Sequence, residues 1–260
     1  MSKDTEKECL NFIHTCELFV WAQAREDTSK IMDFLSSLHP NPKENDFPDF
    51  IGKNGFVEHF QIAGARETNR GSVQSKVQGK MRREFKKFCN FVAKNGESNK
   101  LYPRYISECT PKNSHAYVKD SIQRNWDNHI CSFLKYVSDD QFRMFMLDAR
   151  NIVSLAVAEE IPISVQILTQ VRPFHIPNYW LLADKDMMQW IFENAKGINY
   201  VIFVNRDRCD IIPIKNLPRL ASLLPYNVKI YETPGILMNS GVSFNLPNNQ
   251  ESDDKGNEKN

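Results

Sequence analysis

The chain reads Phe47-Pro48-Asp49-Phe50-Ile51-Gly52-Lys53-Asn54-Gly55-Phe56-Val57-Glu58-His59-Phe60-Gln61-Ile62 over residues 47 to 62. This stretch predicts two short β-strands joined at a Lys53-Asn54-Gly55 turn, because Asn-Gly supplies the positive φ angles that a tight hairpin requires. Its apolar residues are of types that favour strands: Phe50, Phe56, Val57, Phe60 and Ile62. We therefore expect a β-hairpin at this point of the chain.

Two carboxylates, Asp49 and Glu58, stand on the two expected strands. A hairpin with a purely structural role would not require acids at these positions. Acids on neighbouring strands can converge on one point, and carboxylate oxygens are suitable ligands for Mg²⁺. The hairpin therefore predicts a site for a divalent cation, Mg²⁺ or Mn²⁺.

The order Pro48-Asp49, then Glu58, then Phe60 resembles the motif of the PD-(D/E)xK nuclease superfamily, which includes many restriction endonucleases. The resemblance covers residues 49 to 60 closely and residues 10 to 215 loosely. It implies a restriction endonuclease-like core with a central mixed β-sheet flanked by helices. It also implies metal-dependent hydrolysis of DNA, with Asp49 and Glu58 as metal ligands and catalytic residues.

The sequence departs from this motif at the position of the family's lysine, which holds Phe60. Members of the superfamily can recruit a lysine or a glutamine from elsewhere, and the nearest candidates for that catalytic role are Gln61 and Lys76. Gln61 alternates with Phe60 along a regular strand and would face away from the site. A bulge, or Lys76 reaching in from the next helix, would therefore be required.

Residues 6 to 38 predict helix, in one piece or two, because apolar residues recur at spacings of three and four. In the PD-(D/E)xK group the helix before the hairpin often donates a further acid to the metal site. The resemblance thus makes Glu17 a third expected metal ligand. The alternative is a solvated surface glutamate, since this residue type is rarely buried.

A second helix is predicted over residues 72 to 94, where an apolar stripe recurs at three- and four-residue steps. The residues between the apolar positions include a single acid, Glu84, and six bases: Lys76, Lys80, Arg82, Arg83, Lys86 and Lys87. Such a helix could lie along a nucleic-acid backbone and bind its phosphates. The alternative is that these charges only keep an outer face solvated.

Apolar runs of strand length at residues 142–147, 200–204 and 209–214 supply the rest of a sheet, with helices predicted at 121–137 and 187–195. The fold expected is α/β with a mixed sheet. We expect one domain over residues 1–238, with a helical excursion at about 95–140, and a disordered polar tail over 239–260.

The composition of the 260-residue chain sets bounds on function. A net charge of +1 excludes a generally basic nucleic-acid coat, so DNA affinity must come from local patches. The six cysteines include no CxxC pair and the six histidines no HExxH, so we expect no structural zinc. The absence of an apolar run of ~20 residues predicts a cytoplasmic protein without a membrane partner.

Three functions remain open from the sequence. The first is a Mg²⁺-dependent endodeoxyribonuclease, with DNA as the expected partner. The second is a nuclease-fold subunit without catalysis that binds nucleic acid or a protein. The third is an interaction module in which Asp49 only caps a turn. Assembly as a homodimer or with a partner subunit is compatible with all three.

Overall fold

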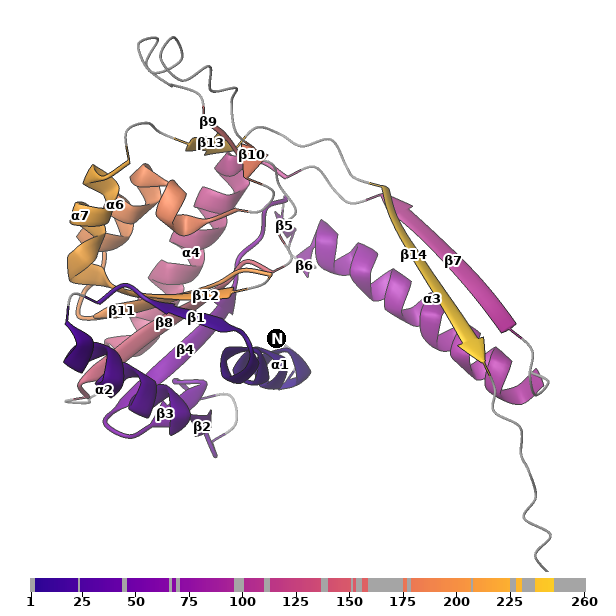
Figure 1. The fold of residues 1–260 in the computed structure, drawn as a ribbon, viewed down its shortest axis with the longest axis horizontal. Helices are drawn as coiled ribbons and strands as arrows, with labels where there is room; N and C mark the ends of the chain where they lie inside the picture. The colour runs from indigo at the N-terminus through magenta and orange to yellow at the C-terminus, as the bar shows by residue number, and fades with distance from the viewer. Residues whose placement is uncertain are drawn as a thin grey trace, which may run out of the picture. The chain divides into compact units, whose positions relative to one another are not determined.

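The structure is a computed structural model of residues 1–260. It describes residues 3–22, 24–43, 46–65, 67–68, 71–95, 101–109, 113–136, 140–150, 152, 156–158, 175–176, 179–206, 208–224, 228–230 and 237–245. Two compact units divide the chain (Figure 1). The first unit comprises Met1–Thr68 and Lys112–Pro234, and the second comprises Asn69–Pro111 and Gly235–Asn260.

A seven-stranded sheet forms the centre of the first unit. Its strand order is β1 (Glu17–Val20), β12 (Arg208–Pro213), β11 (Tyr200–Val204), β8 (Phe142–Asp148), β4 (Gly55–Gln61), β3 (Phe50–Gly52) and β2 (His39–Pro40). The pairs β1–β12, β11–β8 and β8–β4 are parallel, and the pairs β12–β11, β4–β3 and β3–β2 are antiparallel. The expected α/β class with a mixed sheet is therefore confirmed.

Helices cover both faces of this sheet (Figure 1). One face packs on α4 (His115–Phe133), α6 (Lys185–Glu193) and α7 (Leu217–Ser222), and the other packs on α1 (Lys3–Thr15) and α2 (Arg25–Ser36). Strand β8 serves both cores, because successive side chains of a strand point to opposite faces. Its Phe145 packs with Trp126 of α4, and its Met144 packs in the core that contains Phe34 of α2.

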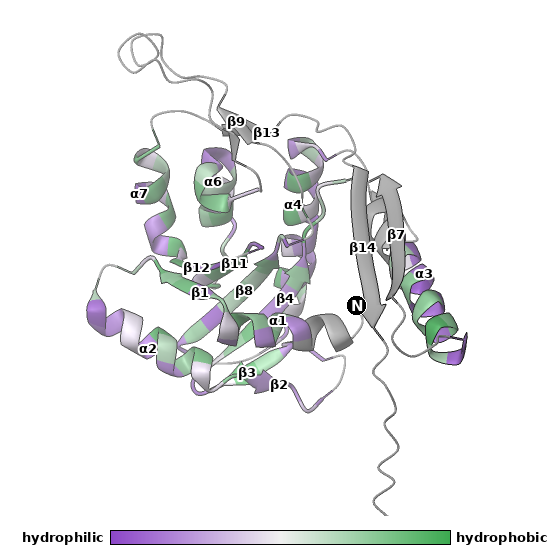
Figure 2. Ribbon diagram, turned by 45° about the vertical axis from the view of Figure 1, so that its right-hand side comes forward, coloured by the Kyte–Doolittle hydropathy of each residue, from purple (hydrophilic) through white to green (hydrophobic). Residues whose placement is uncertain are grey.

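Hydrophobic residues dominate the central strands (Figure 2). All side chains of β11 except the first are buried, as expected for a strand covered on both faces. Short elements complete the first unit: β5 (Glu67–Thr68), β9 (Ala156–Ala158), β10 (His175–Ile176), β13 (Val228–Ile230), and the 3-10 helices η1 (Leu181–Ala183) and η2 (Ile214–Asn216). None of the helices in the described part of the chain is long and apolar enough to span a bilayer.

The predicted hairpin is present as β3 and β4, with Gly52 paired to Gly55 across a two-residue turn. Asn54 has a φ of 61°, so it supplies the left-handed conformation that the turn needs. Gly55 has a different role from the one expected. A Cβ at Gly55 would lie 2.4 Å from the backbone oxygen of Phe142, so glycine is required there by the close approach of β8.

The helix predicted over residues 6 to 38 is wrong in its middle. The structure has α1, then strand β1, then α2. The apolar run Leu18-Phe19-Val20 is held extended by its parallel pairing with β12, almost two hundred positions later in the chain. Pairing between such distant segments overrides the local helical spacing.

The second unit contains β6 (Gly71–Ser72), α3 (Val73–Asn95), β7 (Leu101–Cys109) and β14 (Leu237–Asn245). The helix expected at residues 72 to 94 is confirmed as α3. The domain boundaries differ from those expected. The segment that lies outside the first unit is residues 69–111, whereas an excursion at 95–140 was expected. Residues 239–245 of the expected tail form part of β14, which pairs antiparallel with β7. The remainder of that tail, 246–260, lies outside the described residues.

Candidate functional site

Asp49 and Glu58 are neighbours at the entrance of the hairpin. Phe50 pairs with Val57, so the same register places Asp49 opposite Glu58. The backbone N–H of Asp49 donates to Glu58 Oε2 at 3.0 Å, and the backbone N–H of His59 donates to Asp49 Oδ2 at 2.8 Å. Each carboxylate therefore accepts a hydrogen bond from the backbone of the opposite strand.

Covalent geometry sets an upper limit on the separation of the two acids. An aspartate carboxylate lies within about 5 Å of its own backbone nitrogen. That nitrogen of Asp49 is 3.0 Å from Glu58 Oε2, so the two carboxylates lie within roughly 8 Å of each other. Two oxygen ligands of one Mg²⁺ ion lie roughly 3–4 Å apart, so a shared cation requires the carboxylates to be closer than this limit.

His129 of α4 contacts the other oxygen of Glu58. The distance from His129 Nδ1 to Glu58 Oε1 is 2.6 Å, and Nδ1–H donates because the carboxylate can only accept. Glu58 is 6% exposed, whereas the side chain of His129 is 27% exposed. Both oxygens of a buried carboxylate are thus oriented by donors, as is common for acids that bind metals in proteins.

The position of the family's lysine is filled by a buried aromatic ring. Phe60 is 3% exposed and stacks on the ring of His129, with centroids 4.9 Å apart and planes 12° apart. Gln61 ends β4 on the opposite face from Glu58, and its carbonyl accepts from Asn125 Nδ2 at 3.2 Å. A bulge that would turn Gln61 toward the acids is absent from the regular pairing of β4 with β8.

Glu17 is not at this site. It is the first residue of β1, and strands β12, β11 and β8 lie between β1 and β4. Four strand spacings correspond to roughly 19 Å, too far for Glu17 and Glu58 to share an ion. The expectation was wrong because it placed Glu17 in a helix, whereas the chain enters the far edge strand at this residue.

The basic residues of α3 belong to the second unit, so Lys76 is not placed relative to Asp49 and Glu58. Five of the six are exposed: Lys76, Lys80, Arg83, Lys86 and Lys87. The side chain of Arg82 lies outside the described residues. Lys87 pairs with Glu84 at 2.9 Å, so this acid is engaged within the helix. A basic exposed face on α3 is what the sequence predicted.

A groove adjoins the acid pair. Its volume is about 540 Å³, and its walls include Pro48, next to Asp49, and Ser132, one helical turn after His129. Lys43 and Lys135, both exposed, also line it. Asp49 and Glu58 are not among the lining residues, which also include Asp46, so the groove places two cationic side chains beside the neighbour of Asp49 in sequence.

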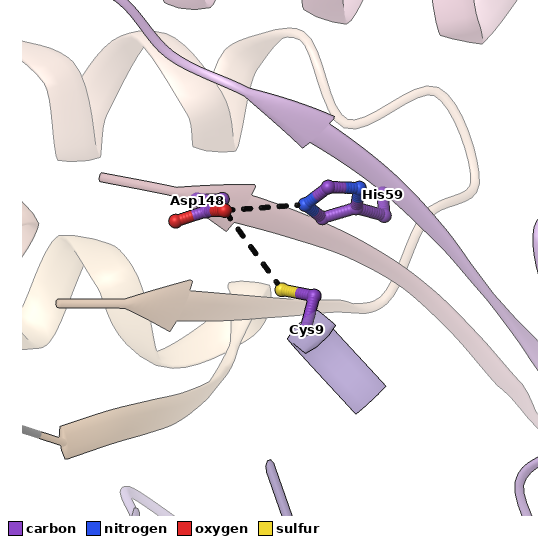
Figure 3. A group of neighbouring side chains, drawn as sticks. All are labelled: Cys9, His59 and Asp148. Atoms are coloured by element: carbon purple, nitrogen blue, oxygen red, sulfur yellow. Dashed lines mark hydrogen bonds and ion pairs between the residues drawn. The ribbon is translucent and has the colours of Figure 1, made fainter. Parts of the chain in front are cut away.

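A second cluster, formed by Cys9, His59 and Asp148, lies on the other face of β4 (Figure 3). His59 Nε2 is 3.5 Å from Asp148 Oδ2, and Cys9 Sγ is 4.0 Å from the same oxygen. One ligand atom from each of the three residues lies within 4.8 Å of the others, and all three residues are buried. This group could hold a metal ion. The sequence patterns gave no sign of this group, because 139 positions separate Cys9 from Asp148.

Arg150 controls the charge of Asp148. Its Nη2 donates to Asp148 Oδ2 at 2.8 Å, and its Nε donates to Oδ1 at 3.0 Å. Burial alone would raise the pKa of Asp148, but the neighbouring His59 ring and the hydrogen bonds from Arg150 outweigh it and hold that pKa below the usual range. Burial raises the pKa of Cys9, and the charge of Asp148 raises it further. Asp148 is therefore ionised and Cys9 is a neutral thiol.

A third buried acid, Asp184, caps α6 and serves the fold. It accepts hydrogen bonds from Met187 N at 3.1 Å, from the hydroxyl of Tyr179 at 2.9 Å, and from His115 Nε2 at 2.6 Å. The hydrogen bond to Asp184 raises the pKa of His115, although partial burial opposes it.

This raised pKa predicts a pH-dependent contribution of His115 to stability. A group whose pKa is higher in the folded state stabilises that state below its unfolded pKa, about 6.5 for histidine, and loses this contribution as pH rises through the folded pKa. The stability lost in His115→Asn should therefore be larger at pH 5.5 than at pH 8.5, as measured by urea unfolding. The exposed His14→Asn is the control, and an equal loss at both pH values for His115→Asn would contradict the prediction.

Comparisons of the chain with family models, with curated proteins and with solved structures found no match. The candidate site is thus defined by the geometry of its own residues: the acid pair Asp49 and Glu58, the histidine that holds Glu58, and the adjoining groove.

Proposed function

We propose that the protein is a Mg²⁺-dependent nuclease that hydrolyses phosphodiester bonds of DNA at Asp49 and Glu58. The observation that carries the proposal is the acid pair itself. Two acids stand opposite each other in the register of a hairpin, each carboxylate accepts from a backbone N–H of the other strand, and Glu58 is held on its second oxygen by His129. Such preorganisation places ligand oxygens before a cation arrives.

The donor set fits Mg²⁺ or Mn²⁺, because carboxylate oxygens are hard ligands and those of Glu58 are already oriented. Asp49 and Glu58 would hold the ion. When bound, it would polarise the scissile phosphate and lower the pKa of the attacking water.

Phe60 stands where the family motif has a lysine, so the motif supplies no cation beside Glu58. His129 is the polar side chain that contacts Glu58 instead. Its ring is fixed from below by the stack on Phe60 and from the side by Glu58 Oε1. Because part of the ring is exposed, the imidazole can hold Glu58 and also face a bound substrate. The proposed role of His129 is to position Glu58 beside the reacting phosphate.

The groove beside the acid pair is the proposed substrate channel. Lys43 and Lys135 on its walls are cations of the kind that contact phosphate oxygens. The exposed bases of α3 provide a further phosphate-binding surface in the second unit.

A plasmid-nicking assay tests the proposal. The wild-type chain should nick supercoiled DNA in Mg²⁺, and Asp49→Asn should lower that rate by ~10²-fold or more. Asparagine retains an oxygen that can accept from His59 N, so the fold should persist. The matched control is Glu26→Gln, an exposed acid paired with Lys30, which should nick like wild type.

Three results would overturn the nuclease proposal. Salt-sensitive DNA binding without nicking would indicate a non-catalytic nucleic-acid-binding subunit, a role favoured by the apolar Phe60 at the lysine position. Neither nicking nor binding would indicate an interaction module. Nicking that Asp49→Asn leaves unchanged would place the activity elsewhere.

A further inference from the structure

His59 is a buried polar side chain whose hydrogen bonds are not made. It is 1% exposed, and within the described residues neither Nδ1 nor Nε2 has a hydrogen-bond partner. Its nearest acidic contact, Asp148 Oδ2, is 3.5 Å away, longer than a charge-assisted hydrogen bond. Buried polar groups without partners are rare in folded proteins, and an ion at the site is one of their recognised explanations.

The spacing of the cluster fits a shared ion better than direct hydrogen bonds. Two nitrogen or oxygen ligands of a tetrahedral zinc ion lie roughly 3.4 Å apart, and a sulfur and an oxygen ligand lie roughly 3.6 Å apart. The corresponding distances are 3.5 Å between His59 Nε2 and Asp148 Oδ2 and 4.0 Å between Cys9 Sγ and Asp148 Oδ2. Small side-chain adjustments would bring all three atoms to one ion.

We propose that Cys9, His59 and Asp148 bind one Zn²⁺ ion. A thiolate, an imidazole and a carboxylate form a borderline-soft donor set that suits zinc and does not suit Mg²⁺. The thioether of Met146, with Sδ 3.2 Å from Cys9 Sγ, adds a further soft atom at this place. Because Glu58 and His59 are consecutive on β4, this site lies on the opposite face of the strand from Glu58, and the proposal does not rest on the proposed nuclease function.

The Zn²⁺ ion would join three segments that are distant in sequence. Cys9 comes from α1, His59 from β4 and Asp148 from the end of β8 (Figure 3). Binding requires the thiolate, so Zn²⁺ displaces the proton of Cys9 and one H⁺ is released for each Zn²⁺ bound. Arg150 remains on Asp148, which shares its two oxygens between the guanidinium and the ion.

A catalytic Cys–His–Asp triad does not fit the same three residues. In such a triad the histidine lies between the thiol and the acid, whereas here Asp148 lies between Cys9 and His59. The thiol is also fully buried, and burial raises its pKa, which disfavours the nucleophilic thiolate. Both observations disfavour a catalytic triad.

The test uses the full chain, stripped of metal with a chelator and titrated with ZnSO₄ against a fluorescent zinc indicator. We expect one equivalent to bind, with release of one proton in weakly buffered solution and a higher unfolding temperature. Cys9→Ala should weaken binding by more than ~100-fold, beyond the effect usual for residues that only support a ligand. The control Cys131→Ala removes an exposed cysteine and should bind like wild type.

Replacement of Zn²⁺ by Co²⁺ gives a readout that requires no activity. A thiolate-to-cobalt charge-transfer band should appear in the wild-type chain and in Cys131→Ala, and it should be absent from Cys9→Ala. Proton release by the wild-type chain keeps the test decisive if Cys9→Ala fails to fold. No stoichiometric zinc, no proton release, or equal displacement by excess Mg²⁺ would overturn the proposal, and none of these results depends on DNA cleavage.

Discussion

Replacing His129 by alanine should slow Mg²⁺-dependent nicking of DNA by ~10²-fold or more, the range typical of a lost proton-transfer or positioning group. The substitution removes the donor that lies 2.6 Å from Glu58 Oε1 and the ring that stacks on Phe60. Glu58 would then be oriented on one oxygen only. The measurement is the single-turnover nicking rate of His129→Ala and of the wild type at saturating Mg²⁺.

A positioning role for His129 differs from a merely structural one in its rescue by a conservative variant. His129→Asn retains a side-chain N–H donor and should recover part of the rate. The control is His14→Ala, which removes an exposed histidine of α1. A normal rate in His129→Ala, or a lower rate fully explained by unfolding, would contradict this role.

Asp210→Ala should lower the free energy of unfolding by about 3–5 kcal/mol, the cost typical of removing one partner of a buried ion pair. Asp210 is fully buried on β12 and accepts hydrogen bonds from Trp21 Nε1 at 2.9 Å and Trp180 Nε1 at 2.8 Å. Arg208 also donates to both of its oxygens, and its guanidinium lies 4.1 Å from the ring centroid of Phe19. The variant would leave one charge and two indole donors without their acceptor.

Urea unfolding of the full chain measures this loss. The exposed acid Asp33 offers a control, because Asp33→Ala should change stability by less than about 0.5 kcal/mol. The double substitution Asp210→Leu with Arg208→Met should recover much of the loss, since apolar residues of similar size often replace a buried ion pair at little cost. A loss below about 1 kcal/mol in Asp210→Ala would show that water solvates the unpaired Arg208 guanidinium. The hydrogen bonds to Asp210 would then contribute little to stability.

Local signals in the sequence were sufficient for most elements of the sheet. Apolar runs predicted β8, β11 and β12, since strands covered on both faces need apolar side chains throughout. The Asn54-Gly55 pair predicted the hairpin turn, because turn chemistry acts over adjacent residues. The two-unit division was missed, because the pairing of β14 with β7 joins segments more than a hundred positions apart.

In the candidate sites, too, some contacts follow from local sequence signals and others do not. The contact between Asp49 and Glu58 follows from the hairpin register, which the sequence of a single turn specifies. His129 carried a weaker signal. It lies three residues after Trp126 and four before Phe133, on the inward stripe of α4, but that spacing does not say which strand residue it meets.

The sequence by itself determined the mixed α/β class, the tight hairpin and the placement of Asp49 opposite Glu58 in its register, because each depends on hydrophobic period or turn geometry within a few residues. Only the tertiary structure decided that Glu17 lies at the far edge of the sheet and that His129 holds Glu58. It alone brought Cys9 and Asp148 to His59. These outcomes depend on strand order and helix packing, which join segments that no local pattern connects.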